Sequence, residues 1–277
     1  MDKLAEMLSP VFMQRALLVG FLVSLCAALL GVCLVLKHFS MIGDGLSHVG
    51  FGSLALATAL GWAPLAVSIP VVVIAAVLLL RMSENGKIKG DSAIALISTG
   101  SLAIGMVIIS LPSVRARGAN IDLSGYMFGS ILSLTNSDVV ISTVLSAVVL
   151  VTFVLFYNKI FAVTFDESFA RATGTKSSAY NMLIALLTAI TIVLGMRMMG
   201  TLLISSLLIF PALTSMRVCK RFKSVIICSA CVSSVCFFSG LCASFFLDLP
   251  CGASVVCANI AAFIIFSVFG ALFSGKR

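Results

Sequence analysis

The chain has 277 residues, of which 61% are hydrophobic and only 10% are charged, and its mean hydropathy is +1.21. Soluble domains carry about 25% charged residues, so this composition excludes an ordinary soluble protein and predicts a membrane protein. The net charge of +8 comes from basic residues that flank apolar stretches. These residues form no domain of their own, which argues against nucleic-acid binding.

Apolar stretches recur along the whole chain at lengths near the ~20 residues that a helix needs to cross a bilayer. We therefore expect an all-α polytopic membrane protein, a bundle of eight or nine transmembrane helices. It should form a single transmembrane domain over residues 1–277, without a soluble domain. The nine candidate stretches are residues 16–36, 43–60, 65–80, 92–111, 139–156, 179–196, 201–216, 225–247 and 254–273. The second, third and seventh are short, so the number of spans stays open between eight and nine.

Basic residues gather in loops that alternating spans would place on one side of the membrane. These segments are 82–91, 159–176, 217–223 and the tail 276–277. Because Lys and Arg favour cytoplasmic loops, we expect these segments and the C-terminus to be cytoplasmic. The N-terminus would then lie outside with nine spans and inside with eight.

Residues 43–48 read Gly-Asp-Gly-Leu-Ser-His and place an acid and one of the two histidines inside an apolar run. On a helix, Asp44 and His48 share one face, with Ser47 beside them. A carboxylate and an imidazole at that spacing can bind one divalent ion such as zinc or manganese. Ionisable residues within a membrane are usually functional, so the pattern favours a metal path. The simpler alternative is a helix-capping aspartate and a hydrogen-bonded histidine at the membrane edge.

The cytoplasmic loop at about 159–177 contains the pattern of a short surface helix followed by a turn. Acidic residues at its start favour a helix N-terminus, two apolar residues give a packing contact, and a glycine offers a stop. In chain order these residues are Asp166, Glu167, Phe169, Ala170 and Gly174. The membrane subunits of ABC importers dock into their ATPase through such a helix, whereas the simpler alternative is an ordinary amphipathic loop.

The sequence lacks the motifs for ATP hydrolysis and for a structural zinc site. The nearest string to a P-loop, residues 174–177, lacks the glycine before the lysine and a preceding strand. ATP use must therefore come from a partner chain, and we expect the chain not to be an enzyme. The Cys228-x-x-Cys231 pair has no second cysteine pair or histidine pair at zinc-site spacing, so we expect the cysteines to pack as small hydrophobes.

Two breaks in the apolar pattern are also informative. Pro211 lies inside the seventh stretch, where it removes a backbone hydrogen bond and predicts a kink that either lines a cavity or only shapes the bundle. The stretch 119–137 is too polar to span and too apolar for a free loop. It is expected to form a helix at the outer surface or a re-entrant helix.

Several strings, in order along nearly the whole chain, resemble the membrane subunits of metal-uptake ABC importers, the zinc and manganese permease family. They are Val35-Leu36-Lys37 through Gly43-Asp44 with Leu46-Ser47-His48, Asp122-Leu123 with residues 126–129, residues 199–204 with 206–212, and Asp248 with Pro250 and residues 252–255. The third string includes Pro211 and resembles the kinked helix of that family. The resemblance strengthens the metal interpretation of Asp44 and His48.

The resemblance implies the permease subunit of an ATP-driven ABC importer of divalent metal ions in the bacterial cytoplasmic membrane. Its partners would be a second copy of itself, a cytoplasmic ABC ATPase, an extracytoplasmic metal-binding protein and the lipid bilayer. Two copies would supply two Asp and two His, a tetrahedral set that suits zinc, with manganese or iron as alternatives. No permanently bound cofactor is expected. Residues 166–176 would be the coupling helix, and the charges expected to meet the binding protein are Arg115, Arg117, Asp122 and Asp248.

Two other classes stay open at this point. An ABC permease for siderophore iron or cobalamin would share the coupling loop but has no use for an intramembrane Asp-His pair. An ion-coupled secondary transporter would typically show more acids in its spans and an internal repeat, which the sequence lacks.

Overall fold

The computed structural model describes residues 9–84, 90–115 and 136–274, and every long element within them is an α-helix. The all-α prediction is confirmed, and each of the nine apolar stretches corresponds to one long helix whose bounds differ by a few residues. In chain order the helices are α2 (Val11–Leu36), α3 (Ile42–Leu60), α4 (Pro64–Glu84), α5 (Gly90–Ser110), α6 (Pro112–Arg115), α8 (Asn136–Leu155), α9 (Tyr157–Phe165), α10 (Glu167–Ala172), α11 (Ser177–Met199), α12 (Thr201–Val218), α13 (Phe222–Leu247) and α14 (Cys251–Ser274).

Eight of the described helices are long and apolar enough to cross a bilayer, and α3 is not among them. Helix α3 contains Asp44 and His48 together with four glycines, which lowers its hydropathy. The eight spans and the nine long helices thus differ by the one helix that holds the candidate metal ligands.

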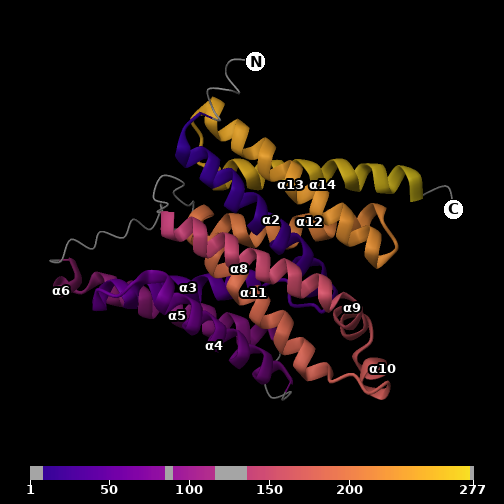
Figure 1. Ribbon diagram of the computed structural model, residues 1–277, viewed down its shortest axis with the longest axis horizontal. Coiled ribbons are helices and arrows are strands. Elements are labelled where there is room, and N and C mark those ends of the chain that lie inside the picture. The colour runs from indigo at the N-terminus through magenta and orange to yellow at the C-terminus, as the bar shows by residue number, and fades with distance from the viewer. Residues whose placement is uncertain (1–8, 85–89, 116–135, 275–277) are drawn as a thin grey trace.

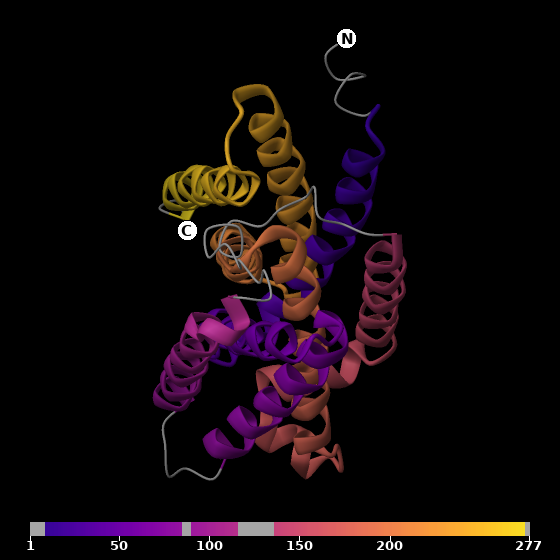
Figure 2. The ribbon, with the colours of Figure 1, turned by 90° about the vertical axis from the view of Figure 1, so that its left-hand side faces the viewer.

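Helix α2 lies at the centre of the bundle, and two-thirds of its most apolar window is buried. Ser229 and Ser233 of α13 donate hydrogen bonds to the carbonyls of Ala28 and Ser24 at 3.2 and 3.0 Å. Because the later residue of one helix meets the earlier residue of the other, α2 and α13 run antiparallel. Figure 2 shows α8 and α14 on opposite flanks, with α2, α12 and α13 between them.

Helices α9 and α10 lie together at one end of the bundle, called the α10 end below (Figure 1). The end of α2, the end of α4 and the start of α11 lie there too, since Lys37, Leu80 and Asn181 line one cavity with Glu167. Helix α6 lies at the opposite end (Figure 1). Nine described basic residues lie at the α10 end: Lys37, Arg81, Lys159, Arg171, Lys176, Arg217, Lys220, Arg221 and Lys223.

Helix α12 continues from Thr201 to Val218 through Pro211, which is buried. Proline has no backbone N–H, so the carbonyl of Leu207 loses its usual partner within the helix. All nine cysteines are free thiols. The helix expected over 119–137 falls almost wholly on residues 116–135, outside the described residues.

Candidate functional site

Asp44 and His48 lie one turn apart near the start of α3, as their spacing predicts. Oδ2 of Asp44 lies 3.6 Å from Nε2 of His48. Two ligand atoms that are each about 2.1 Å from one tetrahedral ion lie about 3.4 Å from each other. The two side chains therefore already have nearly the separation that a shared divalent ion requires.

This pair lies on an open face of the chain. The side chain of Asp44 is 42% exposed and that of His48 is 24% exposed. Nδ1 of His48 is buried and has no hydrogen-bond partner among the described residues. Those residues also contain no group of three or more His, Cys, Asp or Glu that could hold a metal. The pair thus supplies two ligands, and any further ligand must come from water or from another chain.

Two glycines allow α3 to approach its neighbours on either side of Asp44. A Cβ on Gly43 would lie 2.7 Å from Cδ1 of Leu208 on α12, and a Cβ on Gly45 would lie 2.6 Å from Cγ2 of Ile94 on α5. Real Cβ atoms essentially never come that close, so a side chain at either position would require Leu208, Ile94 or α3 itself to shift. The glycines therefore hold the first turn of α3 between α12 and α5.

Ser47, the third residue of the candidate set, has a different environment. Its side chain is fully buried, and its hydroxyl donates to the carbonyl of Asp44 at 2.7 Å. The hydroxyl of Ser47 is buried and bonded within its own helix, whereas the side chains of Asp44 and His48 are partly exposed. The structure thus brings Asp44 and His48 together and gives Ser47 a packing role.

Residues 166–176 contain the short helix that the sequence predicts, and both ends of α10 are capped. Oδ1 of Asp166 accepts a hydrogen bond from the backbone N–H of Phe169 at 2.9 Å, which caps the N-terminus. At the other end, Gly174 has a φ of +81°, and the N–H of Thr175 donates to the carbonyl of Ala170 at 2.9 Å. A glycine in this conformation closes the helix without the strain that a side chain would add.

The two apolar residues of α10 have opposite placements. Ala170 is fully buried within the chain, whereas Phe169 is 64% exposed. Phe165, at the end of α9, is 66% exposed. Several exposed apolar side chains close together mark a contact site, whereas a single exposed apolar side chain is ordinary. We therefore assign the exposed apolar surface of this segment to Phe165 and Phe169 and not to Ala170.

The sequence profile of the ABC 3 transport family matches residues 9–270. The chain is a membrane permease of that family. It is 30% identical over 250 residues to the high-affinity zinc uptake system membrane protein ZnuB of Haemophilus influenzae, covering 90% of this chain and 94% of that protein. It is 28% identical to the manganese transport system membrane protein MntC of Halalkalibacterium halodurans, covering 91% of this chain and 85% of that protein.

The permease is also similar in structure to PsaBC from Streptococcus pneumoniae, solved in complex with Fab. The TM-score is 0.83 at 28% identity, covering 96% of the permease and 94% of that chain. The resemblance to the zinc and manganese permeases is thereby confirmed, and the chain is an ABC-type metal permease. A secondary transporter of a different family is excluded.

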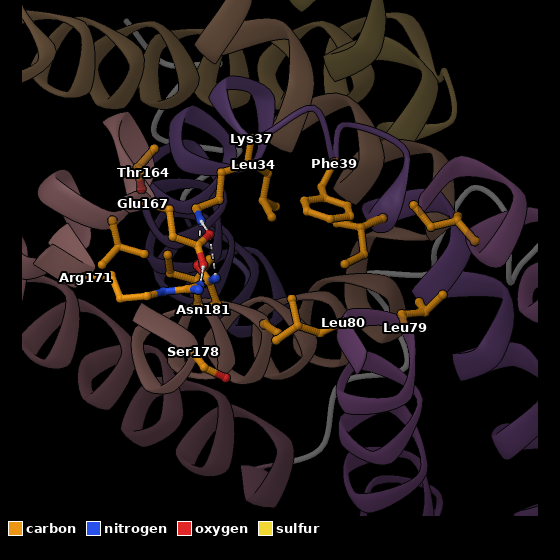
Figure 3. Close-up of a pocket in the computed structure, with 15 residues that line it drawn as sticks. Leu34, Lys37, Phe39, Leu79, Leu80, Thr164, Glu167, Arg171, Ser178 and Asn181 are labelled. Atoms are coloured by element: carbon orange, nitrogen blue, oxygen red, sulfur yellow. Dashed lines mark hydrogen bonds and ion pairs between the residues drawn. The ribbon is translucent and has the colours of Figure 1, made fainter. Parts of the chain in front are cut away.

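A cavity of about 520 Å³ lies at the α10 end of the permease. Figure 3 shows its two contrasting walls. Apolar side chains from the α2–α3 turn and from α4, among them Phe39, Leu79 and Leu80, form one side. Polar side chains meet on the other, among them Glu167 and Asn181. The cavity therefore lies between α10 and the turn that leads into α3.

Glu167 is the centre of the polar wall. Burial of Glu167 raises its pKa, but hydrogen bonds from Asn181 and Arg171 and the charge of Lys37 outweigh this effect, and the pKa is lowered from its ordinary value. The carboxylate is therefore charged at neutral pH. The contact between Lys37 and Asn181 could not be predicted from the sequence, because the two residues are 144 positions apart.

Of the four charges expected on the outer face, two lie within the described residues. Arg115 is the last residue of α6, at the end of the bundle opposite α10 (Figure 1). Asp248 follows α13, is exposed, and has a φ of +53°. Arg117 and Asp122 lie outside the described residues. Arg115 and Asp248 are thus both on the side away from α10.

Proposed function

We propose that the permease imports zinc across the bacterial cytoplasmic membrane and that the ion passes through a transient site formed by Asp44 and His48. The 3.6 Å separation of Oδ2 and Nε2 supports this proposal most directly, because it matches two ligands of one tetrahedral ion. A site with only two ligands per chain replaces part of the hydration shell without trapping the ion, as conduction requires.

A second copy of the permease completes the site. The side chain of Asp44 is 42% exposed, and such a carboxylate must face protein or water, because contact with lipid is costly. A twofold axis beside this face would bring the partner copy's own Asp and His to the same ion. The open face around Asp44 supports this arrangement, which would give a set of two carboxylates and two imidazoles.

The α10 end faces the cytoplasm and binds an ABC ATPase. The gathering of nine basic residues at that end supports this orientation, since Lys and Arg favour the cytoplasmic side. The exposed rings of Phe165 and Phe169 supply an apolar surface for the ATPase. The opposite end, with Arg115 and Asp248, then faces a metal-loaded binding protein outside the cell.

Coupled transport follows from these placements. The binding protein delivers the ion at the outer end, and ATP closes the two ATPase subunits at the α10 end. Movement of α10 then changes the path between the two permease copies, and the ion passes from outer to inner side by way of Asp44 and His48. The permease itself hydrolyses nothing in this scheme.

Metal-resolved uptake in vesicles containing the permease, its ATPase and its binding protein tests the proposal. We expect ATP-dependent zinc uptake, and we expect Asp44→Asn and His48→Ala each to lower it by at least ten-fold while the variant still assembles with the ATPase. His38→Asn is the matched control, because His38 is the other histidine, is exposed, and has a φ of +61° that Asn tolerates. Parental uptake by both site variants would remove the pair from the mechanism.

A manganese importer is the second candidate. The carboxylate of Asp44 and the similarity to a manganese transport system membrane protein favour it. Competition between zinc, manganese and iron in the same vesicles separates the candidates. Uptake of manganese with no inhibition by zinc would replace zinc by manganese and leave the site assignment unchanged.

A further inference from the structure

The strongest polar cluster outside the metal site joins three helices at the α10 end. Oε1 of Glu167 accepts a hydrogen bond from Arg171 at 2.8 Å, and Oε2 accepts one from Nδ2 of Asn181 at 3.1 Å. Nζ of Lys37 donates to Oδ1 of Asn181 at 2.5 Å and lies 3.8 Å from Oε2 of Glu167. Figure 3 shows these side chains converging on one another. The end of α2, the start of α11 and α10 are thus connected through one carboxylate.

This connection is held in place by desolvation as well as by hydrogen bonds. The side chain of Lys37 is only 14% exposed, so its ammonium group has exchanged most of its water for protein partners. If Lys37 lost those partners, its largely buried charge would be left unpaired, which is strongly unfavourable. Lys37 therefore follows Glu167 and Asn181 when they move.

Lys37 is also the C-cap residue that follows α2, and α3 begins five residues later. The turn between them is tightly bonded: the N–H of Phe39 donates to the carbonyl of Leu34 at 2.9 Å, and the N–H of Ile42 donates to that of Phe39 at 3.1 Å. His38 in this turn has a φ of +61°, a conformation that residues other than glycine rarely adopt. A turn with this much internal bonding moves as one piece.

Space for such a movement exists beside the turn. Leu34, Phe39 and Ile42 pack against the hydrophobic core and also line the cavity of about 520 Å³, so unfilled volume lies next to this side of the turn. Asp44 lies two residues beyond Ile42. A shift of the turn into the cavity would therefore reorient the first turn of α3 and the carboxylate that it holds.

We propose that Lys37 and Asn181 are positioning residues that transmit movement of α10 to Asp44 and His48 through the α2–α3 turn. This proposal rests on the proposed function, because it assigns α10 to the ATPase and Asp44 to the transported ion. Glu167 moves with α10, Lys37 transmits that movement to the α2–α3 turn, and Asn181 fixes the geometry between them. Neither Lys37 nor Asn181 contacts the ion or ATP.

The test uses the full complex of permease, ATPase and binding protein in nanodiscs and vesicles. Lys37→Met keeps an unbranched side chain that is one atom shorter and removes its charge. We expect metal uptake per ATP hydrolysed to fall at least five-fold, while assembly and basal ATP hydrolysis stay at the parental level. Lys37→Arg, which keeps a cationic donor, should retain most of the parental ratio. Lys220→Met, an exposed lysine at the same end, is the matched control and should not change it.

A second readout does not depend on transport. In the parent, hydrogen exchange at residues 41–50 should respond to ATP binding, and Lys37→Met should abolish that response while the response at residues 167–172 remains. Should Lys37→Met fail to assemble, Asn181→Ala takes its place with the same expected losses.

Parental uptake per ATP together with a parental exchange response at 41–50 in the variant would overturn the proposal. Failure of the proposed function would look different. In that case the parental complex itself would show no metal uptake, while the exchange experiment would still report whether α10 and α3 are linked.

Discussion

Gly45 on α3 faces Ile94 on α5 so closely that a Cβ at position 45 would lie 2.6 Å from Cγ2 of the isoleucine. The contact lies next to Asp44, and the two helices run parallel, since Gly52 further along α3 likewise meets Ser101 of α5. The position of Asp44, the candidate metal ligand, therefore depends on how closely α3 approaches α5.

Gly45→Ala should push the first turn of α3 away from α5 and lower metal uptake several-fold. Overpacking of this kind typically costs about 1–3 kcal/mol, so reduced thermal stability in detergent should accompany the loss. Ile94→Ala removes the obstructing methyl group, and the double variant should recover most of the uptake. Gly100→Ala is the matched control, because a Cβ at Gly100 meets nothing within 4 Å. An equal defect in the control, or no recovery in the double variant, would contradict this explanation.

Phe169→Ser should weaken binding of the ATPase by about 10- to 30-fold without destabilising the permease, because an exposed aromatic residue at the centre of a contact often contributes about 2 kcal/mol. Binding of the purified ATPase to permease in nanodiscs measures this change. Phe246→Ser, which alters a partly exposed ring near the end of α13 away from α10, is the control.

Ala170→Glu should act differently, since Ala170 is buried within the chain. It should place an unpaired charge inside the packing of α10 and unfold that segment, which is expected to appear as raised hydrogen exchange in the isolated permease before any ATPase is added. Normal exchange in that variant would mean that Ala170 is free to face the ATPase.

The attachment of α10 should be insensitive to pH over the physiological range. The pKa of Glu167 is lowered from its ordinary value of 4.5, chiefly because hydrogen bonds and the charge of Lys37 outweigh the opposing effect of burial. A carboxyl group with a lowered pKa in the folded state stabilises the fold above its unfolded pKa, and that contribution is lost as pH falls through the folded pKa. Exchange at residues 167–175, corrected for intrinsic rates, should therefore rise only below about pH 4.5. Glu167→Gln should exchange faster at pH 7 and show no such transition, whereas a rise near pH 6 in the parent would contradict the direction of the shift.

The limits of prediction from sequence follow the range of the interactions. Hydropathy placed the nine long helices, and the local signals of Asp166 and Gly174 placed α10, because both depend on neighbours in sequence. Nothing local separates buried Ala170 from exposed Phe169, since a helix of six residues is too short to show which face packs. The contact between Lys37 and Asn181 could not be predicted for a different reason. It forms only when α2 and α11 pack together.

Arg115, at the end opposite α10, and Arg117, which the sequence predicts on the same face, should steer the binding protein toward the permease. Reversing Arg115 and Arg117 together to Glu should slow uptake by up to about ten-fold at limiting binding protein and low salt, because long-range attraction raises the rate of encounter. The defect should shrink at high salt, where a Debye length of about 3 Å at 1 M screens exposed charges, and it should vanish at saturating binding protein. Asp248→Lys changes the charge at the same end in the opposite direction and should not slow uptake. Uptake kinetics across salt and binding-protein concentrations measure these effects. A defect that does not depend on salt, or labelling that finds position 115 on the cytoplasmic side, would overturn both the docking role and the orientation of the bundle.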